Sequence, residues 1–134
     1  MKQKGAELNG HPIHASECRN LSDALLVTGF PYDAKDDSRP YMAMFENMIN
    51  ASIGVRRLGS AAVDLCYVAC GRFEGFWEKH LKPWDTAAGF LIAEEAGARI
   101  TDFSGNAYTI DNPEILATNG HIHDEMRTIL NKKR

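Results

Sequence analysis

The sequence has no apolar run long enough to span a bilayer, and its first ten residues, MKQKGAELNG, have no hydrophobic segment typical of a signal peptide. It has no basic excess either: 15 Lys and Arg stand against 18 Asp and Glu, for a net charge of −3. This balance gives no general attraction to nucleic acid or to an acidic membrane. The sequence therefore favours a protein that needs neither as a partner.

Cysteine is scarce, and the three cysteines cannot form a complete set of disulfides. Cys66 and Cys70 lie one helical turn apart, a spacing also compatible with a metal site, but the surrounding residues are apolar and provide no further ligands. Reduced, buried thiols are the preferred interpretation, and they indicate a cytoplasmic protein.

The composition is that of one globular domain: 134 residues, of which 44% are hydrophobic and 25% charged, without repeats or low-complexity segments. A hairpin is expected within 5–16 around the Asn9-Gly10 turn, followed by a polar loop over 18–23. The patterns predict strands over 24–30, 53–59, 72–78, 98–103 and 114–119, and helices over 40–51, 60–70, 83–98 and 121–134. The expected fold is α/β, a mixed sheet of about five strands covered by helices.

Two of the expected helices have distinctive patterns. In the stretch KPWDTAAGFLIAEEAGA, Trp84, Ala87, Ala88, Leu91 and Ile92 fall on one face, which predicts an amphipathic helix with Asp85 in its first turn. The helix over 60–70 is apolar nearly all round, with Asp64 as its only charge, and is expected to be buried on more than one side.

The first candidate site is the turn Gly59-Ser60-Ala61, where a strand leads into a helix. Free backbone N–H groups collect at a helix N-terminus, and glycine lets a ligand approach them closely. The alternative is a capped helix start with no ligand.

The second candidate site is the connection from Glu78, at a strand end, to Asp85, at a helix start. Ligands of open α/β sheets often bind at such strand ends. The helix dipole favours an ionised Asp85, which suits a hard cation. The alternative is that both acids are solvated or only cap the helix.

Weaker candidates are the histidines and one acidic loop. His11, His14, His121 and His123 have sparse metal-like spacings without a clear third ligand, and solvation is the better interpretation of Asp33, Asp36 and Asp37. Ser60 lacks the Gly-x-Ser-x-Gly context of a nucleophile.

The stretch GSAAVDLCYVACGRFEGFWEKHLKPWDTAAGFLIAEEAGARITDFSG strongly resembles the C-terminal half of the inositol monophosphatase family. The family's signature is matched by a set of small, aliphatic and acidic positions: Trp84, Asp85, Ala87, Ala88, Gly89, Leu91, Ile92, Gly97 and Ala98. The resemblance extends over essentially the whole chain and implies the C-terminal domain of a sugar-phosphatase-like fold.

The resemblance also implies a function. Members of the family are Mg²⁺-dependent phosphomonoesterases acting on inositol phosphates and related sugar or nucleotide phosphates, by attack of a metal-activated water on phosphorus. It implies that Asp85 ligates one metal, and that Gly59, Ser60, Ala61 and Glu78 bind substrate hydroxyls. Without the family's N-terminal half, sheet edges and apolar surface would be uncovered, so we also expect a homo-oligomer, most simply a dimer, or a complementary N-terminal half as partner.

One departure from the family is large. The family's Asp-Pro-Ile/Leu-Asp-Gly-Thr motif and an upstream Glu provide most metal ligands, and this sequence contains neither Asp-Pro nor Asp-Gly. Residues 1–20 then represent a hairpin remnant of the N-terminal half, and 21–134 the C-terminal domain. With no catalytic residue of its own, the chain is expected to have little or no activity alone, as a fragment, a split-enzyme subunit or a truncated product. The alternative is an inactive module that binds a sugar phosphate or a protein.

Overall fold

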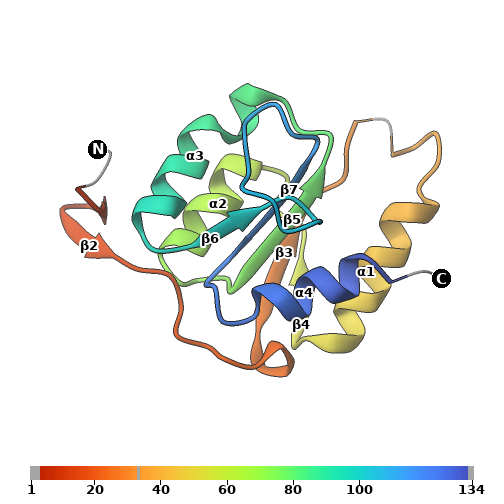
Figure 1. Ribbon diagram of the computed structural model, residues 1–134, viewed down its shortest axis with the longest axis horizontal. Coiled ribbons are helices and arrows are strands. Elements are labelled where there is room, and N and C mark those ends of the chain that lie inside the picture. Colours follow the sequence, from red (N-terminus) through yellow and green to blue (C-terminus); the bar gives the residue numbers. More distant parts are fainter. Residues whose placement is uncertain (1–3, 33, 133–134) are drawn as a thin grey trace.

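A computed structural model describes residues 4–32 and 34–132 and places a five-stranded mixed sheet at the centre (Figure 1). Its strand order is β4-β3-β5-β7-β6, with β3, β4 and β5 parallel and β7 antiparallel to both neighbours. The strands are β3 (Leu25–Thr28), β4 (Gly54–Arg56), β5 (Gly75–Lys79), β6 (Arg99–Thr101) and β7 (Glu114–Thr118). The expected fold class is confirmed, although every strand is shorter than its predicted range.

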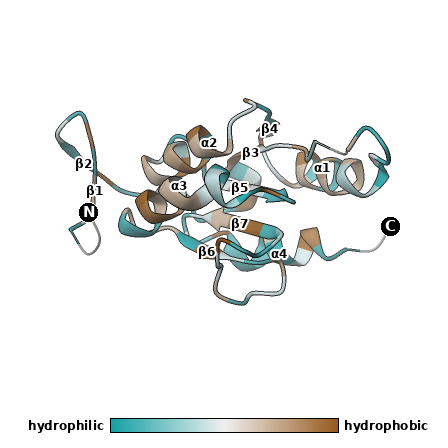
Figure 2. Cartoon of the chain, turned by 90° about the horizontal axis from the view of Figure 1, so that it is seen from above, coloured by the Kyte–Doolittle hydropathy of each residue, from teal (hydrophilic) through white to brown (hydrophobic). Residues whose placement is uncertain are grey.

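Four helices cover the two faces of the sheet: α1 (Arg39–Ala51), α2 (Ala61–Ala69), α3 (Pro83–Glu95) and α4 (His123–Leu130). Figure 2 shows α2 and α3 on one side of the sheet and α1 and α4 on the other. Side chains that alternate along β5 separate the two cores: Phe76 packs with residues of α2, and Trp77 packs with Met48 of α1 and Met126 of α4. Full burial of each such side chain stabilises the fold by about 2 kcal/mol.

The hairpin of β1 (Ala6–Leu8) and β2 (His11–Ile13) forms around Asn9-Gly10 as expected, both with positive φ, and lies at one end of the molecule (Figure 1). Two connections hold it to α3: the Ala15 N–H donates to the Ala96 carbonyl at 3.0 Å, and a Glu95 carboxylate oxygen accepts from the Lys4 N–H at 2.8 Å. The domain boundary at residue 20 stays a prediction.

The polar loop expected over 18–23 is wrong at its C-terminal end. A short 3₁₀ helix, Leu21–Asp23, forms there, and Leu21 is 1% exposed. Leu21 packs into the same core cluster as Trp77 and Met48, so tertiary burial outweighs the polar composition of the segment.

The apolar stripe of α3 faces away from the core, contrary to the expected amphipathic pattern. Trp84 is 78% exposed and Ala87 and Ala88 are exposed, whereas Thr86, Gly89 and Ala93 are buried. The reason is close packing against α2: a Cβ on Gly89 would lie 2.9 Å from the Leu65 Cβ. Small residues therefore form the innermost part of the helix, Trp84 is left outside, and Phe90 and Ile92 are partly buried.

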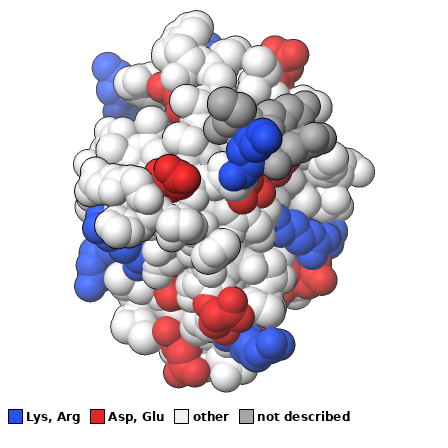
Figure 3. Space-filling model, turned by 90° about the vertical axis from the view of Figure 1, so that its left-hand side faces the viewer, with Lys and Arg blue, Asp and Glu red and all other residues white. Residues whose placement is uncertain are grey.

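As expected, α2 is buried on more than one side, against the sheet and against α3, yet Ala62 and Val63 on its outer face are exposed. In the part of the chain that the structure describes, no helix has both the length and the apolar character needed to cross a membrane. On the face at the hairpin end, acidic and basic side chains are interspersed (Figure 3).

Candidate functional site

A cavity of about 240 Å³ lies where β3 and β5 end and where α2 and α3 begin. All five residues that the sequence singled out line it: Gly59, Ser60, Ala61, Glu78 and Asp85. Gly29, Phe30, Arg57, His80 and Trp84 also line it. The two candidate sites are therefore one site, at the carboxyl ends of parallel strands where α/β sheets bind ligands.

The turn at Gly59-Ser60 opens α2 toward this cavity. Ser60 is the N-cap residue, and its hydroxyl accepts a hydrogen bond from the Val63 N–H at 3.3 Å. Gly59 has φ +89°, a conformation that favours glycine. The alternative of a capped helix start thus holds for the Ser60 side chain, while the backbone of the same turn lines the cavity.

Glu78 is only 7% exposed, so its interpretation as a solvated acid is wrong. The backbone of Gly29 lies directly against its carboxyl group, since a Cβ on Gly29 would lie 2.8 Å from the Glu78 Cδ. Burial raises the pKa of Glu78 to about 7, the negative charges of Asp64 and Asp85 add to this, and Arg57 opposes it. Near neutral pH this carboxyl group exists in both protonation states.

Asp85 is half-buried and caps α3, in agreement with the alternative that this acid caps the helix. Its Oδ2 accepts from the Lys82 N–H at 2.9 Å, at the N-terminal end of the helix where a carboxylate is favoured. Among the described residues Oδ1 has no hydrogen-bond donor, so one oxygen of this carboxylate remains for a ligand.

A magnesium ion fits the donor set only in part. Mg²⁺ takes hard oxygen ligands in an octahedron, usually one or two carboxylates with phosphate and water oxygens. Asp85 offers one such oxygen, but the described residues contain no group of three His, Cys, Asp or Glu side chains placed to hold a metal. The described residues of this chain therefore do not by themselves complete a magnesium site.

The weaker candidates are accounted for by other contacts. His123 is fully buried between two threonines, His121 lies 3.9 Å from Glu17, and Asp37 pairs with Arg39 at 2.9 Å. Asp36, His11 and His14 are exposed, and Asp33 lies outside the described residues. Cys66 and Cys70 are half-buried free thiols.

Two charged residues of the site were missed by the sequence reasoning. Arg57 lines the cavity, with its guanidinium carbon 5.8 Å from the Phe30 ring centroid. Asp64 of α2 is 1% exposed, and its charge acts on Glu78. The signal for Asp64 was present, because it is the only charge in an otherwise apolar helix.

The fold and the cavity define an α/β protein with a polar, acidic ligand site at the strand ends. The family model of the inositol monophosphatase family matches residues 1–134, and the chain belongs to this family.

Individual relatives agree with this assignment. The chain is 45% identical over 122 residues to the chloroplastic phosphatase IMPL1 of Arabidopsis thaliana, covering 91% of this chain and 33% of that protein. It is 44% identical to an inositol-1-monophosphatase of Synechocystis, covering 94% and 44%. The solved inositol monophosphatase of Anabaena superimposes with a TM-score of 0.91 at 44% identity, over 96% of this chain and 51% of that one. The chain spans about a third to a half of the length of these three proteins.

Proposed function

We propose that this chain is the substrate-binding part, with one metal ligand, of a magnesium-dependent phosphatase acting on inositol phosphate or a related sugar phosphate. The observation that carries the proposal is the convergence of Gly59, Ser60, Ala61, Glu78 and Asp85 on one cavity. Membership of the inositol monophosphatase family supports the same reaction class.

The residues divide the work by their chemistry. Glu78, when ionised, accepts hydrogen bonds from substrate hydroxyls, and the backbone of Gly59–Ala61 faces the same space at the start of a helix. Asp85 holds magnesium through its uncommitted oxygen, and Trp84 beside it covers one wall. When bound, magnesium activates water and stabilises charge on the phosphoryl oxygens. No side chain of this chain is assigned as a catalytic residue.

The experiment compares this chain alone with a chimera. The segment of the Synechocystis relative outside the matched region is fused to this chain, and Mg²⁺-dependent phosphate release from inositol 1-phosphate is measured for both. We expect release from the chimera and little or none from the chain alone. Robust release by the chain alone would contradict the incomplete metal site. A folded chimera that binds magnesium but releases no phosphate would contradict the proposed phosphatase activity.

A second candidate function is a module without catalysis that binds a sugar phosphate or a protein. The observation that favours a protein partner is an exposed apolar face on α2 and α3, formed by Val63 (39% exposed), Trp84 (78%), Ala87 and Ala88. Such faces mark interaction sites. Under either function, the partner that covers this face is a complementary half or a second copy in a dimer. Saturable ligand binding without turnover in the chimera would favour the second function over the phosphatase.

The cytoplasmic location also stays a prediction. It is supported by three cysteines that are free thiols.

A further inference from the structure

His80 has a backbone conformation that is uncommon for a residue with a side chain. Its φ is +63°, in the left-handed region where glycine is the usual residue. Among the described residues, Asn9 is the other non-glycine residue with positive φ, and the tight turn of its hairpin requires that conformation. His80 lies in no hairpin, because it follows β5 on the connection to α3.

The fold uses the backbone of His80 but not its side chain. The His80 N–H donates to the Pro113 carbonyl at 2.6 Å, directly beyond the paired residues Lys79 and Glu114 of β5 and β7. The imidazole is exposed, and in the part of the chain that the structure describes it has no hydrogen bond or ion pair. Glycine would make the same backbone hydrogen bond without strain, so the imidazole itself needs an explanation.

The position of His80 in the candidate site provides that explanation. His80 follows Glu78 by two residues, and both line the cavity at the end of β5. The basic side chains that line the cavity are Arg57 and His80, and His80 is the one that shares a strand end with Glu78. An ionised carboxylate only accepts hydrogen bonds, whereas each hydroxyl group of a polyol both donates and accepts them. A polyol bound at Glu78 therefore needs a donor beside this carboxylate.

We propose that His80 is a specificity-determining residue, whose imidazole N–H donates a hydrogen bond to a hydroxyl oxygen of the polyol phosphate bound at Glu78. The proposal rests on the proposed role of Glu78 in binding substrate hydroxyls. An imidazole carries at least one N–H in either protonation state, so the donor does not depend on the charge of the ring. Together, the acceptor Glu78 and the donor His80 distinguish a ring that carries hydroxyl groups from one that does not.

The test compares two phosphate esters of the same six-membered ring: inositol 1-phosphate, which carries ring hydroxyls, and cyclohexyl phosphate, which carries none. Their dissociation constants are measured by NMR titration of the ¹⁵N-labelled chain, for wild type, His80→Gly and His80→Ala. Both substitutions are expected to weaken inositol 1-phosphate binding by roughly three- to tenfold, as for the loss of one hydrogen bond, and to leave cyclohexyl phosphate binding unchanged. His14→Asn, at an exposed histidine of the N-terminal segment, is the control and should change neither constant.

The two variants at His80 also separate the imidazole from the backbone. Both lack the ring, but glycine tolerates φ +63° and alanine does not, so His80→Gly should have the higher urea midpoint. Equal losses of preference for inositol 1-phosphate assign the effect to the imidazole. A loss confined to His80→Gly would assign it to backbone freedom and overturn the proposal. A midpoint of His80→Ala at or above that of His80→Gly would contradict the left-handed backbone from which the proposal starts.

The ring of His80 is also observed directly. In wild type its imidazole ¹⁵N signals are expected to shift more with inositol 1-phosphate than with cyclohexyl phosphate, while those of His11, exposed in the hairpin, stay in place. An unchanged preference for inositol 1-phosphate in both variants overturns the role of His80 and leaves the proposed function standing. Absence of binding of both esters to wild type contradicts the proposed function, and the role of His80 with it.

Discussion

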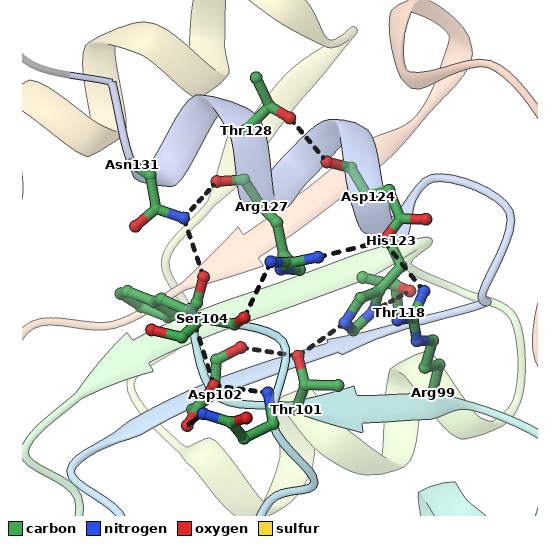
Figure 4. A network of polar contacts seen from close by, with 12 residues as sticks. Arg99, Thr101, Asp102, Ser104, Thr118, His123, Asp124, Arg127, Thr128 and Asn131 are labelled. Carbon is green, nitrogen blue, oxygen red and sulfur yellow. Dashed lines mark hydrogen bonds and ion pairs between the residues drawn. The ribbon is translucent and has the colours of Figure 1, made fainter.

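The imidazole of His123 donates a hydrogen bond from Nε2 to the Thr101 hydroxyl at 2.8 Å (Figure 4). The direction follows from the neighbours: the Thr101 hydroxyl donates its own proton to the Asp102 carbonyl at 2.6 Å, so its oxygen must accept from the ring. Burial keeps the ring neutral at pH 7, so Nδ1 is unprotonated and accepts from the Thr118 hydroxyl at 2.8 Å, whose oxygen accepts from the Gly120 N–H. The network thus specifies a neutral histidine inside the fold.

Acid should therefore destabilise the protein through His123. Burial, with Arg99 and Arg127, lowers the pKa of His123 to about 4, against about 6.5 in the unfolded chain. Between these values the unfolded chain binds more protons, so the stability that this histidine contributes is complete above pH 6.5 and is lost as the pH falls toward 4. The loss should reach about 3 kcal/mol and be measurable by urea unfolding at a series of pH values.

His123→Gln should lower stability at pH 7 but flatten this acid slope, because glutamine does not titrate. His14→Asn, an exposed histidine, is the control and should leave the slope unchanged. A slope that persists in His123→Gln would show that other groups cause the acid loss.

Asp85 caps α3 and is also proposed to ligate magnesium, and two substitutions separate these two roles. Asp85→Asn keeps an oxygen for the Lys82 N–H and should change the free energy of unfolding little, whereas Asp85→Ala should lose about 1 kcal/mol. Both should weaken magnesium binding in the chimera. Unchanged magnesium-dependent turnover in Asp85→Asn would mean that Asp85 only caps the helix.

Gly29→Ala should disturb Glu78 directly. The new Cβ would meet the Glu78 carboxyl group, with Cδ 2.8 Å away, so the carboxyl group must move at a cost of about 1 to 3 kcal/mol. We expect weaker inositol 1-phosphate binding, measured by calorimetry. Gly54→Ala is the matched control, because its Cβ would meet only the flexible end of Arg56 at 3.1 Å. Equal binding by the two variants would argue against a role for Glu78.

Trp84→Ala should distinguish a covered face from a free one. In the isolated chain the side chain is 78% exposed, and its loss should change the free energy of unfolding by less than about 0.5 kcal/mol. In the chimera the same change should cost on the order of 2 kcal/mol if the added segment buries Trp84. Ile53 is 67% exposed on another part of the surface, so Ile53→Ala is the control and should change the free energy of unfolding little in both proteins. If Trp84→Ala also has a small effect in both proteins, the face that contains Trp84 stays uncovered in the chimera.

Local signals predicted much of the fold. Periodicity identified four helices and five strands, the Asn9-Gly10 turn identified the hairpin, and Ser60 identified the start of α2. Each of these signals depends on neighbouring residues alone, so it can be recognised without the tertiary structure. Strand ends were less well predicted, because ladder pairing with a neighbouring strand, which sets them, is not visible in the local pattern.

Other features depended on contacts between distant segments. The stripe of α3 that begins at Trp84 had the correct period and the wrong orientation, because the close approach of α2 selects the side with Gly89. Leu21 is buried although its neighbours are polar, because its side chain packs into the core cluster that contains Met48 and Trp77.

The sequence by itself determined the residue types of the site, a helix mouth at Gly59–Ala61 and carboxylates at Glu78 and Asp85, together with the α/β order of elements. Only the tertiary structure decided that these residues line one cavity and that Glu78 and Asp64 are buried. The physical reason is that the charge state of a carboxyl group depends on desolvation and on nearby charges, and both come from segments far apart in the chain.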